Sequence, residues 1–434
     1  MSHALVSLWG TTIGAVRWDS EREIGLFEYE PDFLRSGIQV APLHMPLAGA
    51  IYSFPALNHE TFHGLPGLLA DALPDRFGNA LINAWLASQG RDASSFNPVE
   101  RLCYTGARAM GALEFRPSLK LGNAPTHELD VSALVDLASR ILSDRNALSG
   151  SFADGQEGAA VRDILRVGTS AGGARAKAVI AWNPQSGEIR SGDADHKKGF
   201  EHWLLKFDGV SNNRDRELAD PKGFGKIEYA YHKMALAAGI DMTACQLLRE
   251  NGRSHFMTKR FDRTADGSKI HLQSLCGLAH FDFNMAGAYA YEQALLVMRQ
   301  LSLPMAQLEQ QFRRAAFNIV ARNQDDHVKN IAFLMDKTGQ WQLSPAFDVT
   351  YSYNPDGQWT SQHQMSLNGK RRDFTREDFD ACAHAASFKR GRATQILQEV
   401  IAAVRNWLEF AANAGVQQQT ATQIAATHRL NFLN

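Results

Sequence analysis

The chain has 434 residues, of which 44% are hydrophobic and 21% are charged. This composition is ordinary for a soluble globular protein, and the length predicts two or more packed units. The 45 basic side chains nearly balance the 46 acidic ones, so net charge gives no support for bulk binding to nucleic acid or to a membrane surface.

The cysteines and the N-terminus bear on the compartment. Cys103, Cys245, Cys276 and Cys382 have no C-x-x-C spacing and lie among apolar neighbours, as expected of reduced thiols in a protein core. The chain does not open with a basic region followed by a long apolar run, and no window reaches about 18 uninterrupted apolar residues. We therefore expect a cytoplasmic protein that does not enter a membrane.

Residues 1–125 are expected to form a small mixed subdomain. Short β-like segments separated by glycine and charged turns predict strands at 5–9, 14–18 and 24–29. Helical spacing then predicts helices at 65–73, 77–89 and 98–104. Glycine, asparagine and proline in 119–128 predict a connector.

A glycine-rich segment dominates residues 126–263. Residues 168–177 read GTSAGGARAK. Glycine clusters occur in any tight turn, but backbone amides without side chains can also approach phosphate oxygens closely. Around this segment the pattern predicts strands at 178–182, 202–207 and 254–261, and a helix at 226–238.

Lys206 lies in the middle of an apolar strand segment. Burying an unpaired ammonium group costs several kcal/mol, so this lysine needs an anion unless the strand is an exposed edge. A nucleotide phosphate or Glu228 on the following helix could supply it. Strands carrying a lysine, followed by a helix carrying a glutamate, suit the nucleotide-binding lobe of a kinase.

Residues 264–434 are predicted to be mainly helical, with helices at 291–301, 305–322 and 393–414. Between them lies the sequence NQDDHVKN at 323–330, followed by the strand-like segment 344–348. Asp325 and Asn330 have the Asp-x-x-x-x-Asn spacing of a kinase catalytic loop. Asp325 can orient an attacking hydroxyl and accept its proton, while Asn330 and Asp348 offer the oxygen ligands that Mg²⁺ prefers.

Asp325, Asp326 and His327 could instead suggest a metal hydrolase. Adjacent loop residues rarely bind one ion together, and the sequence has no H-E-x-x-H motif or separated histidine set to complete a zinc site. We therefore favour phosphoryl transfer. His327 and Lys329 could hold the loop or contact phosphate, and both interpretations stay open.

Taken in order, these motifs resemble the HipA family of bacterial serine/threonine protein kinases, the toxins of type II toxin–antitoxin systems. The resemblance covers nearly the whole chain and includes segments 6–10, 14–16, 67–75, 106–115, 170–177, 206–207, 260–263, 325–330 and 345–348. It implies an α+β, two-lobed, protein-kinase-like fold with a small N-terminal β-rich subdomain and a mainly helical C-terminal lobe. The expected division is an N-terminal subdomain at 1–125, a nucleotide-binding lobe at 126–263 and a catalytic lobe at 264–434.

The resemblance also implies roles for individual residues. Asp325 matches the catalytic aspartate, and Asn330 and Asp348 match the Mg²⁺ ligands. The residues implied to contact ATP are Gly172, Gly173, Ala174, Arg175, Ala176, Lys177, Lys206, Lys259, Arg260, Phe261, His327 and Lys329.

Ser170 matches the serine that family members autophosphorylate, and Thr169 is an alternative acceptor. Adding nearly two negative charges to a phosphate-binding loop should repel ATP and turn the enzyme off. Both hydroxyls could instead only stabilise the turn. Two departures from better-known members stand out: Arg175 is expected to alter phosphate contacts, and Asp326, where some members have glycine, is expected to add negative charge near the metal.

The family further implies a protein substrate among translation components, such as an aminoacyl-tRNA synthetase, and growth inhibition as the result. It implies a HipB-like helix-turn-helix antitoxin as partner, with operator DNA reached only through that partner. Basic clusters at 370–372 and 389–392 could touch DNA in such a complex, although a solvated surface explains them more simply. Two alternatives remain: a small-molecule phosphotransferase, and a non-catalytic corepressor partner of a DNA-binding antitoxin.

Overall fold

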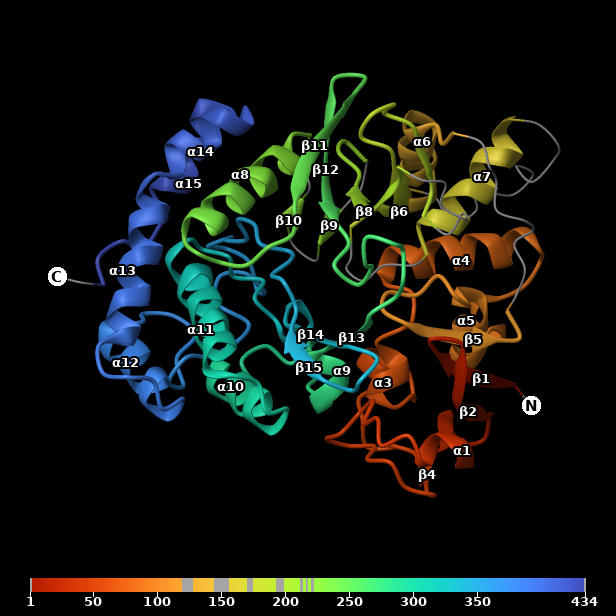
Figure 1. Ribbon diagram of the computed structural model, residues 1–434. Coiled ribbons are helices and arrows are strands. Elements are labelled where there is room, and N and C mark those ends of the chain that lie inside the picture. The colour runs from red at the N-terminus through yellow and green to blue at the C-terminus, as the bar shows by residue number, and fades with distance from the viewer. Residues whose placement is uncertain are drawn as a thin grey trace.

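The computed structural model in Figure 1 describes residues 2–118, 128–143, 156–169, 175–192, 199–210, 214–215, 218–219 and 222–432. The chain starts in a β-rich region, passes through a second strand-containing region, and ends in a group of helices on the opposite side of the molecule. The architecture is therefore α+β, as predicted. Within these ranges no helix is both long and apolar enough to cross a membrane.

The N-terminal sheet is built from alternating sequence and one tight turn. Its antiparallel strands run in the order β4-β3-β2-β1-β5 and are β1 (His3–Leu8), β2 (Thr11–Asp19), β3 (Ile24–Tyr29), β4 (Ile51–Tyr52) and β5 (Leu113–Arg116). Trp9 and Gly10 join β1 to β2 with φ angles of 50° and 83°, which a two-residue hairpin turn requires. Alternate residues Ala4, Val6 and Leu8 are buried. The three strands predicted in this region are confirmed.

Short helices complete this region. They are α1 (Pro31–Leu34), α2 (His59–Phe62), α3 (Gly67–Ala70), α4 (Arg76–Ser88), the 3-10 helix η1 (Ala93–Ser95) and α5 (Pro98–Thr105). Asp75 caps α4, since its Oδ1 accepts a hydrogen bond from the Gly78 amide at 2.6 Å. Asn97 and Glu100 form a capping box at the start of α5. The predicted helix at 65–73 is only the single turn α3, bracketed by Pro66 and Pro74.

The second region contains a five-stranded antiparallel sheet in the order β11-β12-β8-β6-β7. The strands are β6 (Lys177–Trp182), β7 (Ile189–Ser191), β8 (Glu201–Lys206), β11 (Cys245–Glu250) and β12 (Arg253–Lys259), with the short pair β9 (Arg214–Asp215) and β10 (Leu218–Ala219) outside the sheet. The helices are α6 (Val131–Ser143), α7 (Gln156–Val167) and α8 (Phe224–Ala237). Helix α8 packs on β11 and β12, and α7 packs on β6 and β7.

The C-terminal region is mainly helical, as predicted, and also contains a small sheet β13-β14-β15 that was not predicted. Its elements are β13 (His271–Ser274), α9 (Leu275–Ala279), α10 (Tyr291–Gln300), α11 (Met305–Val320), the 3-10 helix η2 (Val328–Asn330), β14 (Ala332–Met335), β15 (Trp341–Leu343), α12 (Arg376–Ala385), α13 (Arg392–Arg405), α14 (Trp407–Ala414) and α15 (Gln418–Ala425).

Two predictions for this region are wrong. The helix expected at 393–414 is broken at Asn406 into α13 and α14. The break lets Trp407 enter the core, where it is 1% exposed and donates a hydrogen bond from Nε1 to the Ala421 carbonyl at 2.9 Å. Asp348 was expected on a strand-like segment, but β15 ends at Leu343 and Asp348 has a φ of 56°. That left-handed backbone turns the chain at the residue proposed as a metal ligand.

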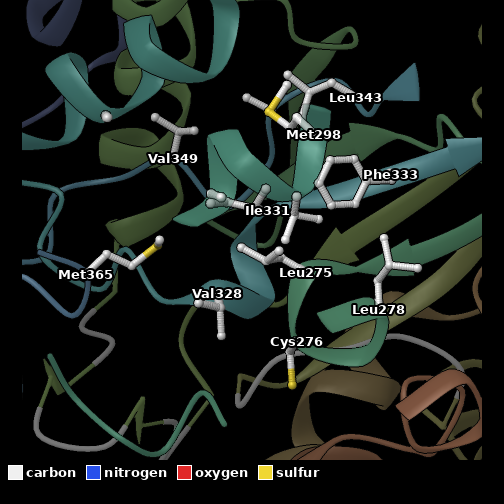
Figure 2. Close-up of a cluster of buried hydrophobic side chains, with 14 of the residues drawn as sticks. Leu275, Cys276, Leu278, Met298, Val328, Ile331, Phe333, Leu343, Val349 and Met365 are labelled. Carbon is white, nitrogen blue, oxygen red and sulfur yellow. The ribbon is translucent and has the colours of Figure 1, made fainter. Parts of the chain in front are cut away.

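The hydrophobic core has two main parts. The larger joins the N-terminal sheet to α8 and to the C-terminal helices, and the smaller gathers α4, α6, α7, β6 and β8. Each fully buried aromatic side chain, such as Phe317 or Phe333, stabilises the fold by about 1.5–3 kcal/mol. Figure 2 shows the part of the larger core in which Val328 and Ile331 meet Leu275. This packing fixes the chain on both sides of Asn330.

Candidate active site

The loop at 323–330 follows the C-terminal end of α11 and leads through η2 into β14. Its apolar residues Val328 and Ile331 are 2% and 5% exposed. The side chain of Asn330 donates a hydrogen bond from Nδ2 to the backbone carbonyl of Asp325 at 3.0 Å. The loop therefore closes on itself and brings Asp325 and Asn330 together, as the sequence predicted.

The carboxylate of Asp325 is held by a residue to which the sequence assigned no role. Trp359 donates a hydrogen bond from its indole Nε1 to Asp325 Oδ1 at 2.6 Å. A hydrogen bond to an ionised carboxylate is shorter and stronger than one between neutral groups. Trp359 therefore fixes one oxygen of Asp325 and restricts the direction of the other. No motif could have revealed this contact, because Trp359 lies in an irregular loop far along the chain.

Lys206 has carboxylates from two different regions as partners. Its Nζ lies 2.6 Å from Glu228 Oε1 on α8, and it also contacts Asp348 Oδ1. Burial alone would lower the pKa of Lys206, but Asp348 and Glu228 outweigh it, so the net shift raises the pKa. Burial alone would raise the pKa of Asp348, but Lys206 holds it well below its usual value. Glu228 thus supplies an anion for Lys206, one of the two possibilities left open.

Asn330 and Asp348 have the chemistry that a Mg²⁺ ion needs. Both line a small cavity of about 30 Å³, together with His327 and Phe347. The amide nitrogen of Asn330 is used by Asp325, which leaves its carbonyl oxygen as the ligand atom, and Asp348 has a second carboxylate oxygen beyond the one that contacts Lys206. Among the described residues no group of three or more His, Cys, Asp and Glu side chains could hold a metal. One or two protein oxygens suffice for Mg²⁺ in sites completed by substrate phosphates.

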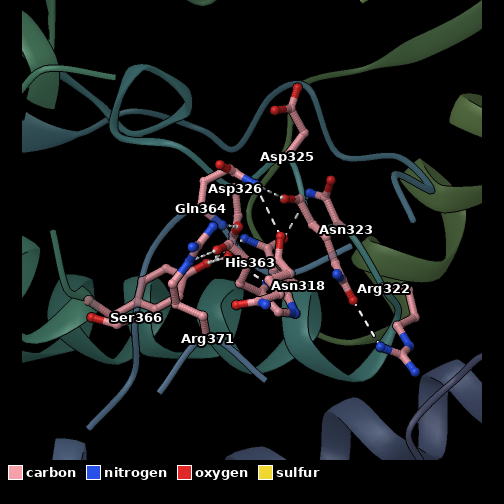
Figure 3. Close-up of polar contacts among 12 residues, drawn as sticks. Asn318, Arg322, Asn323, Asp325, Asp326, His363, Gln364, Ser366 and Arg371 are labelled. Atoms are coloured by element: carbon pink, nitrogen blue, oxygen red, sulfur yellow. Dashed lines mark hydrogen bonds and ion pairs between the residues drawn. The ribbon is translucent and has the colours of Figure 1, made fainter. Parts of the chain in front are cut away.

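Asp326 does not add charge near the metal, contrary to the expectation from sequence. Figure 3 shows its carboxylate with His363 and Gln364, while the carboxylate of Asp325 points away from them. Asp326 is 3% exposed. It accepts hydrogen bonds from the Tyr291 hydroxyl at 2.5 Å and the Gln364 amide at 2.7 Å, and its Oδ2 pairs with His363 Nδ1 at 2.8 Å. Burial would raise the pKa of Asp326, but these partners lower it, so the residue serves as a buried support for the loop.

The glycine-rich segment is only partly described. Ser170, Gly172, Gly173 and Ala174 lie outside the described residues. The hydroxyl of Thr169 is buried and donates a hydrogen bond to the Leu165 carbonyl at 2.9 Å, an arrangement that withholds it from phosphorylation. Ala176 is fully buried. Arg175 is 7% exposed, and its guanidinium lies 3.9 Å from the centre of the Phe224 ring.

The remaining residues assigned to ATP have partners within the protein. Lys177 Nζ lies 2.8 Å from Asp75 Oδ2, Lys259 Nζ lies 2.7 Å from Glu201 Oε1, and Arg260 pairs with Asp262 at 2.6 Å. The structure does not bring Lys259 or Arg260 into the group formed by Lys206, Glu228 and Asp348.

Aromatic rings hold three further residues assigned to ATP. The Phe261 ring lies 5.6 Å from that of Phe347, beside Asp348. His327 and Lys329 both lie against Phe283, at 5.6 Å between ring centres and 5.0 Å from Nζ to ring centre. A cation over an aromatic face is attracted to it. These contacts fit the interpretation in which His327 and Lys329 hold the loop.

Comparison with known proteins agrees with this geometry. Two family models match, the HipA N-terminal domain over residues 4–116 and the HipA-like C-terminal domain over residues 169–408. A solved HipA, in complex with HipB and operator DNA from Shewanella oneidensis MR-1, has the same fold, with a TM-score of 0.67, 17% identity, and coverage of 98% of this chain and 96% of that one. Y4mE of Sinorhizobium fredii, named as a candidate kinase, is 26% identical over 159 residues. That alignment spans 34% of this chain and 37% of the length of Y4mE.

Proposed function

The chain belongs to the HipA family, and from this membership we propose that it is an ATP- and Mg²⁺-dependent protein serine/threonine kinase. The family, the fold and the relative named as a kinase support a HipA-type kinase. The cofactors, the phosphorylated residue type and the target are the substance of the proposal.

The observation that carries the proposal is the ion pair between Lys206 and Glu228 beside Asp348. Protein kinases need a strand lysine paired with a helix glutamate, and an aspartate metal ligand, in place at the same time. In the proposal Lys206 binds ATP phosphates, Asp325 accepts the proton of the attacking hydroxyl, and Asn330 and Asp348 hold Mg²⁺. When bound, the ion would neutralise charge on the phosphates. Trp359 would keep Asp325 oriented toward the hydroxyl.

Other residues assigned to ATP stay predictions. They are Gly172, Gly173, Ala174, Arg175, Ala176, Lys177, Lys259, Arg260, Phe261, His327 and Lys329. Backbone amides in the glycine-rich segment would suit phosphate oxygens, and Phe261 beside Phe347 would suit the adenine side. The ammonium groups of Lys177 and Lys259 would act in the presence of their carboxylate partners.

Regulation and partners follow the same family logic. We propose that Ser170 is the autophosphorylated residue and that the added charge turns the enzyme off; the buried hydroxyl of Thr169 argues against the alternative acceptor. The target would be a translation component such as an aminoacyl-tRNA synthetase, and growth inhibition would follow. The Shewanella complex supports a HipB-like antitoxin as partner, with operator DNA reached through it. Such partners would place the protein in the cytoplasm.

The test is mass spectrometry of the purified protein after incubation with Mg²⁺ and ATP. We expect phosphate on Ser170 in the wild type, none at that position in Ser170→Ala, and a loss of at least about 100-fold in rate in Asp325→Asn, as for removal of a general base. Asp336→Asn, an exposed carboxylate on a distant turn, is the control and should behave as wild type.

Two outcomes would count against the proposal. A wild type that binds ATP but carries no phosphate would favour a small-molecule phosphotransferase or a non-catalytic partner of an antitoxin. Equal phosphorylation of wild type and Asp325→Asn would remove Asp325 as the base.

A further inference from the structure

The segment before α4 makes a buried ion pair with the strand that leaves the glycine-rich segment. Lys177, the first residue of β6, places Nζ 2.8 Å from Asp75 Oδ2, and the two side chains are 3% and 2% exposed. Asp75 uses its other oxygen to cap α4 through the Gly78 amide. Burial raises the pKa of Asp75, and the ammonium group of Lys177 opposes that rise. A buried charge without its partner is strongly destabilising, so each member of this pair requires the other.

The chain on the other side of the glycine-rich segment also rests on α4. A Cβ added to Gly168 would lie 2.5 Å from Leu81 Cδ1, and one added to Gly78 would lie 3.1 Å from the Cα of Thr169. Contacts this close leave no room for a side chain at either position. Residues just before and just after 170–174 are therefore both fixed to the N-terminal turns of α4, a helix that precedes them by many residues in the sequence.

Lys177 is also the cross-strand neighbour of Lys206. The register of β6 and β8 places these two lysines directly opposite each other, and like charges in that position repel. Lys206 is satisfied by Glu228 and Asp348, while Lys177 is satisfied by Asp75. The charge of Lys177 nevertheless reaches Asp348, whose pKa it lowers after burial and Lys206 have acted. Without Asp75, the nearest carboxylates for Lys177 would be those that Lys206 uses.

We infer that Asp75 is a positioning residue that holds the Lys177 ammonium away from Asp348 and so leaves the Asp348 carboxylate to Lys206 and a divalent cation. This inference rests on the proposed function, because it concerns the proposed metal ligand. It assigns a task in the kinase site to the segment before α4, in the N-terminal region. Asp75 acts through Lys177 and Asp348 and does not itself touch substrate.

The test compares Asp75→Asn with the double variant Asp75→Asn/Lys177→Met. Asparagine is a good helix cap, so the single variant keeps α4 capped but leaves the lysine without a countercharge. The double variant removes that lysine charge while keeping a side chain of similar length. Binding of a non-hydrolysable ATP analogue is titrated calorimetrically at a series of Mg²⁺ concentrations, and thermal unfolding is followed in parallel.

We expect Asp75→Asn to raise the Mg²⁺ concentration needed for half-maximal analogue binding by about 10- to 100-fold, the usual effect of losing a group that orients a metal ligand. We expect its unfolding temperature to fall. The double variant should recover both values, because the competing ammonium is gone. A rescue of this kind is not expected of a residue that only stabilises the fold.

Asp378→Asn is the matched control. Asp378 also lies at a helix N-terminus, accepts the Lys370 ammonium at 2.8 Å and the Thr375 amide at 2.7 Å, and is buried. It should lower the unfolding temperature without changing the Mg²⁺ dependence. An unchanged Mg²⁺ dependence in Asp75→Asn, or a double variant that remains impaired, would overturn the inference. Failure of the wild type itself to phosphorylate would instead overturn the proposed function, and the binding and unfolding series would still report on the pair.

Discussion

At the scale of single residues, the position of the Asp325 carboxylate depends on Trp359. The indole of Trp359 is half-buried and donates to Asp325 Oδ1 at 2.6 Å. This bond leaves the other oxygen of Asp325 to face an incoming hydroxyl. A general base must lie within hydrogen-bond reach of the proton it removes, so a small rotation of this carboxylate should slow the reaction.

Trp359→Phe keeps an aromatic ring and removes the indole donor. A hydrogen bond to a charged group contributes about 1.5–3 kcal/mol, so we expect kcat to fall about 10- to 100-fold while KM for ATP stays near its wild-type value. Steady-state kinetics with a peptide acceptor would measure both. Trp341→Phe is the control, because the Trp341 indole also donates a hydrogen bond, to the Gln39 carbonyl at 3.3 Å, outside the site. A Trp359→Phe enzyme that matched or exceeded wild type would show that the bond has no positioning role.

The sequence predicted the members of the site better than their surroundings. Asp325 and Asn330 are joined by a hydrogen bond, and Lys206 meets Glu228 and Asp348, because the spacing of a catalytic loop and a lysine in an apolar strand each reflect a local physical need. Asp326 was misjudged, since the sequence does not show to which side of a loop a residue turns. Trp359 and the pairing of Asp75 with Lys177 depend on contacts between distant segments.

At the scale of elements, α3 and α9 are locked together by two glycines. A Cβ added to Gly67 would lie 2.1 Å from the carbonyl oxygen of Gly277, and one added to Gly277 would lie 2.9 Å from that of Gly67. Asp71, just after α3, accepts hydrogen bonds from the amide and hydroxyl of Ser274, which caps α9. Helix α9 in turn contacts η2 in the catalytic loop. The spacing of α3 and α9 is therefore transmitted to Asn330.

Gly67→Ala should destabilise the protein by about 1–3 kcal/mol, as overpacking against rigid backbone usually does. The measurement is chemical denaturation, with kcat as a second readout because α9 supports the catalytic loop. Gly49→Ala is the control: Gly49 is exposed, and its nearest atom to an added Cβ is Leu34 Cδ1 at 3.9 Å. Equal stability of both variants with wild type would mean that α3 and α9 can separate without loss.

The elements also show why sequence patterns succeed or fail. β1, β2 and β3 were found because polar and apolar residues alternate along one half-buried sheet. The break at Asn406 between α13 and α14 was missed, since neither proline nor glycine marks it and the apolar spacing continues across it. β13, β14 and β15 were missed because each is only three or four residues long, too short for a periodic signal.

At the scale of the whole molecule, the N-terminal region is joined to both later regions. One core cluster contains residues of the N-terminal sheet together with α8 and α13, and the other contains α4 with β6 and β8. The Trp9 indole donates a hydrogen bond to the Lys269 carbonyl at 2.9 Å, and the Asn58 amide donates one to Asp282 at 2.8 Å. The division at residues 125 and 263 stays a prediction. Packing that crosses both positions leads us to expect cooperative unfolding.

A buried ion cluster lies where the N-terminal region meets the linker between the two lobes. Asp262 is fully buried and accepts hydrogen bonds from Arg260, Arg263 and the Gly111 amide, at 2.6 Å, 2.9 Å and 2.6 Å. Arg263 also donates to the Gly111 carbonyl at 3.0 Å. Burial alone would raise the pKa of Asp262, but the two guanidinium groups hold it well below its usual value. The ionised carboxylate is therefore favoured in the folded protein over the unfolded chain.

Asp262→Asn should lower the free energy of unfolding at pH 7 by about 3–5 kcal/mol, because it leaves two buried guanidinium groups without a countercharge. Asp32→Asn is the control: Asp32 pairs with Arg35 at 2.6 Å, but their side chains are 82% and 75% exposed, and such surface pairs contribute about 0–1 kcal/mol. Because the folded pKa of Asp262 is depressed, its stabilisation is fully present above the unfolded pKa of about 3.9 and is lost as the pH falls below that value. The difference in stability between wild type and Asp262→Asn, measured by denaturation from pH 7 to pH 2, should therefore be constant down to about pH 5 and shrink in more acidic solution. A difference that stayed constant at every pH would mean that the cluster stabilises the protein through packing and not through the charge of Asp262.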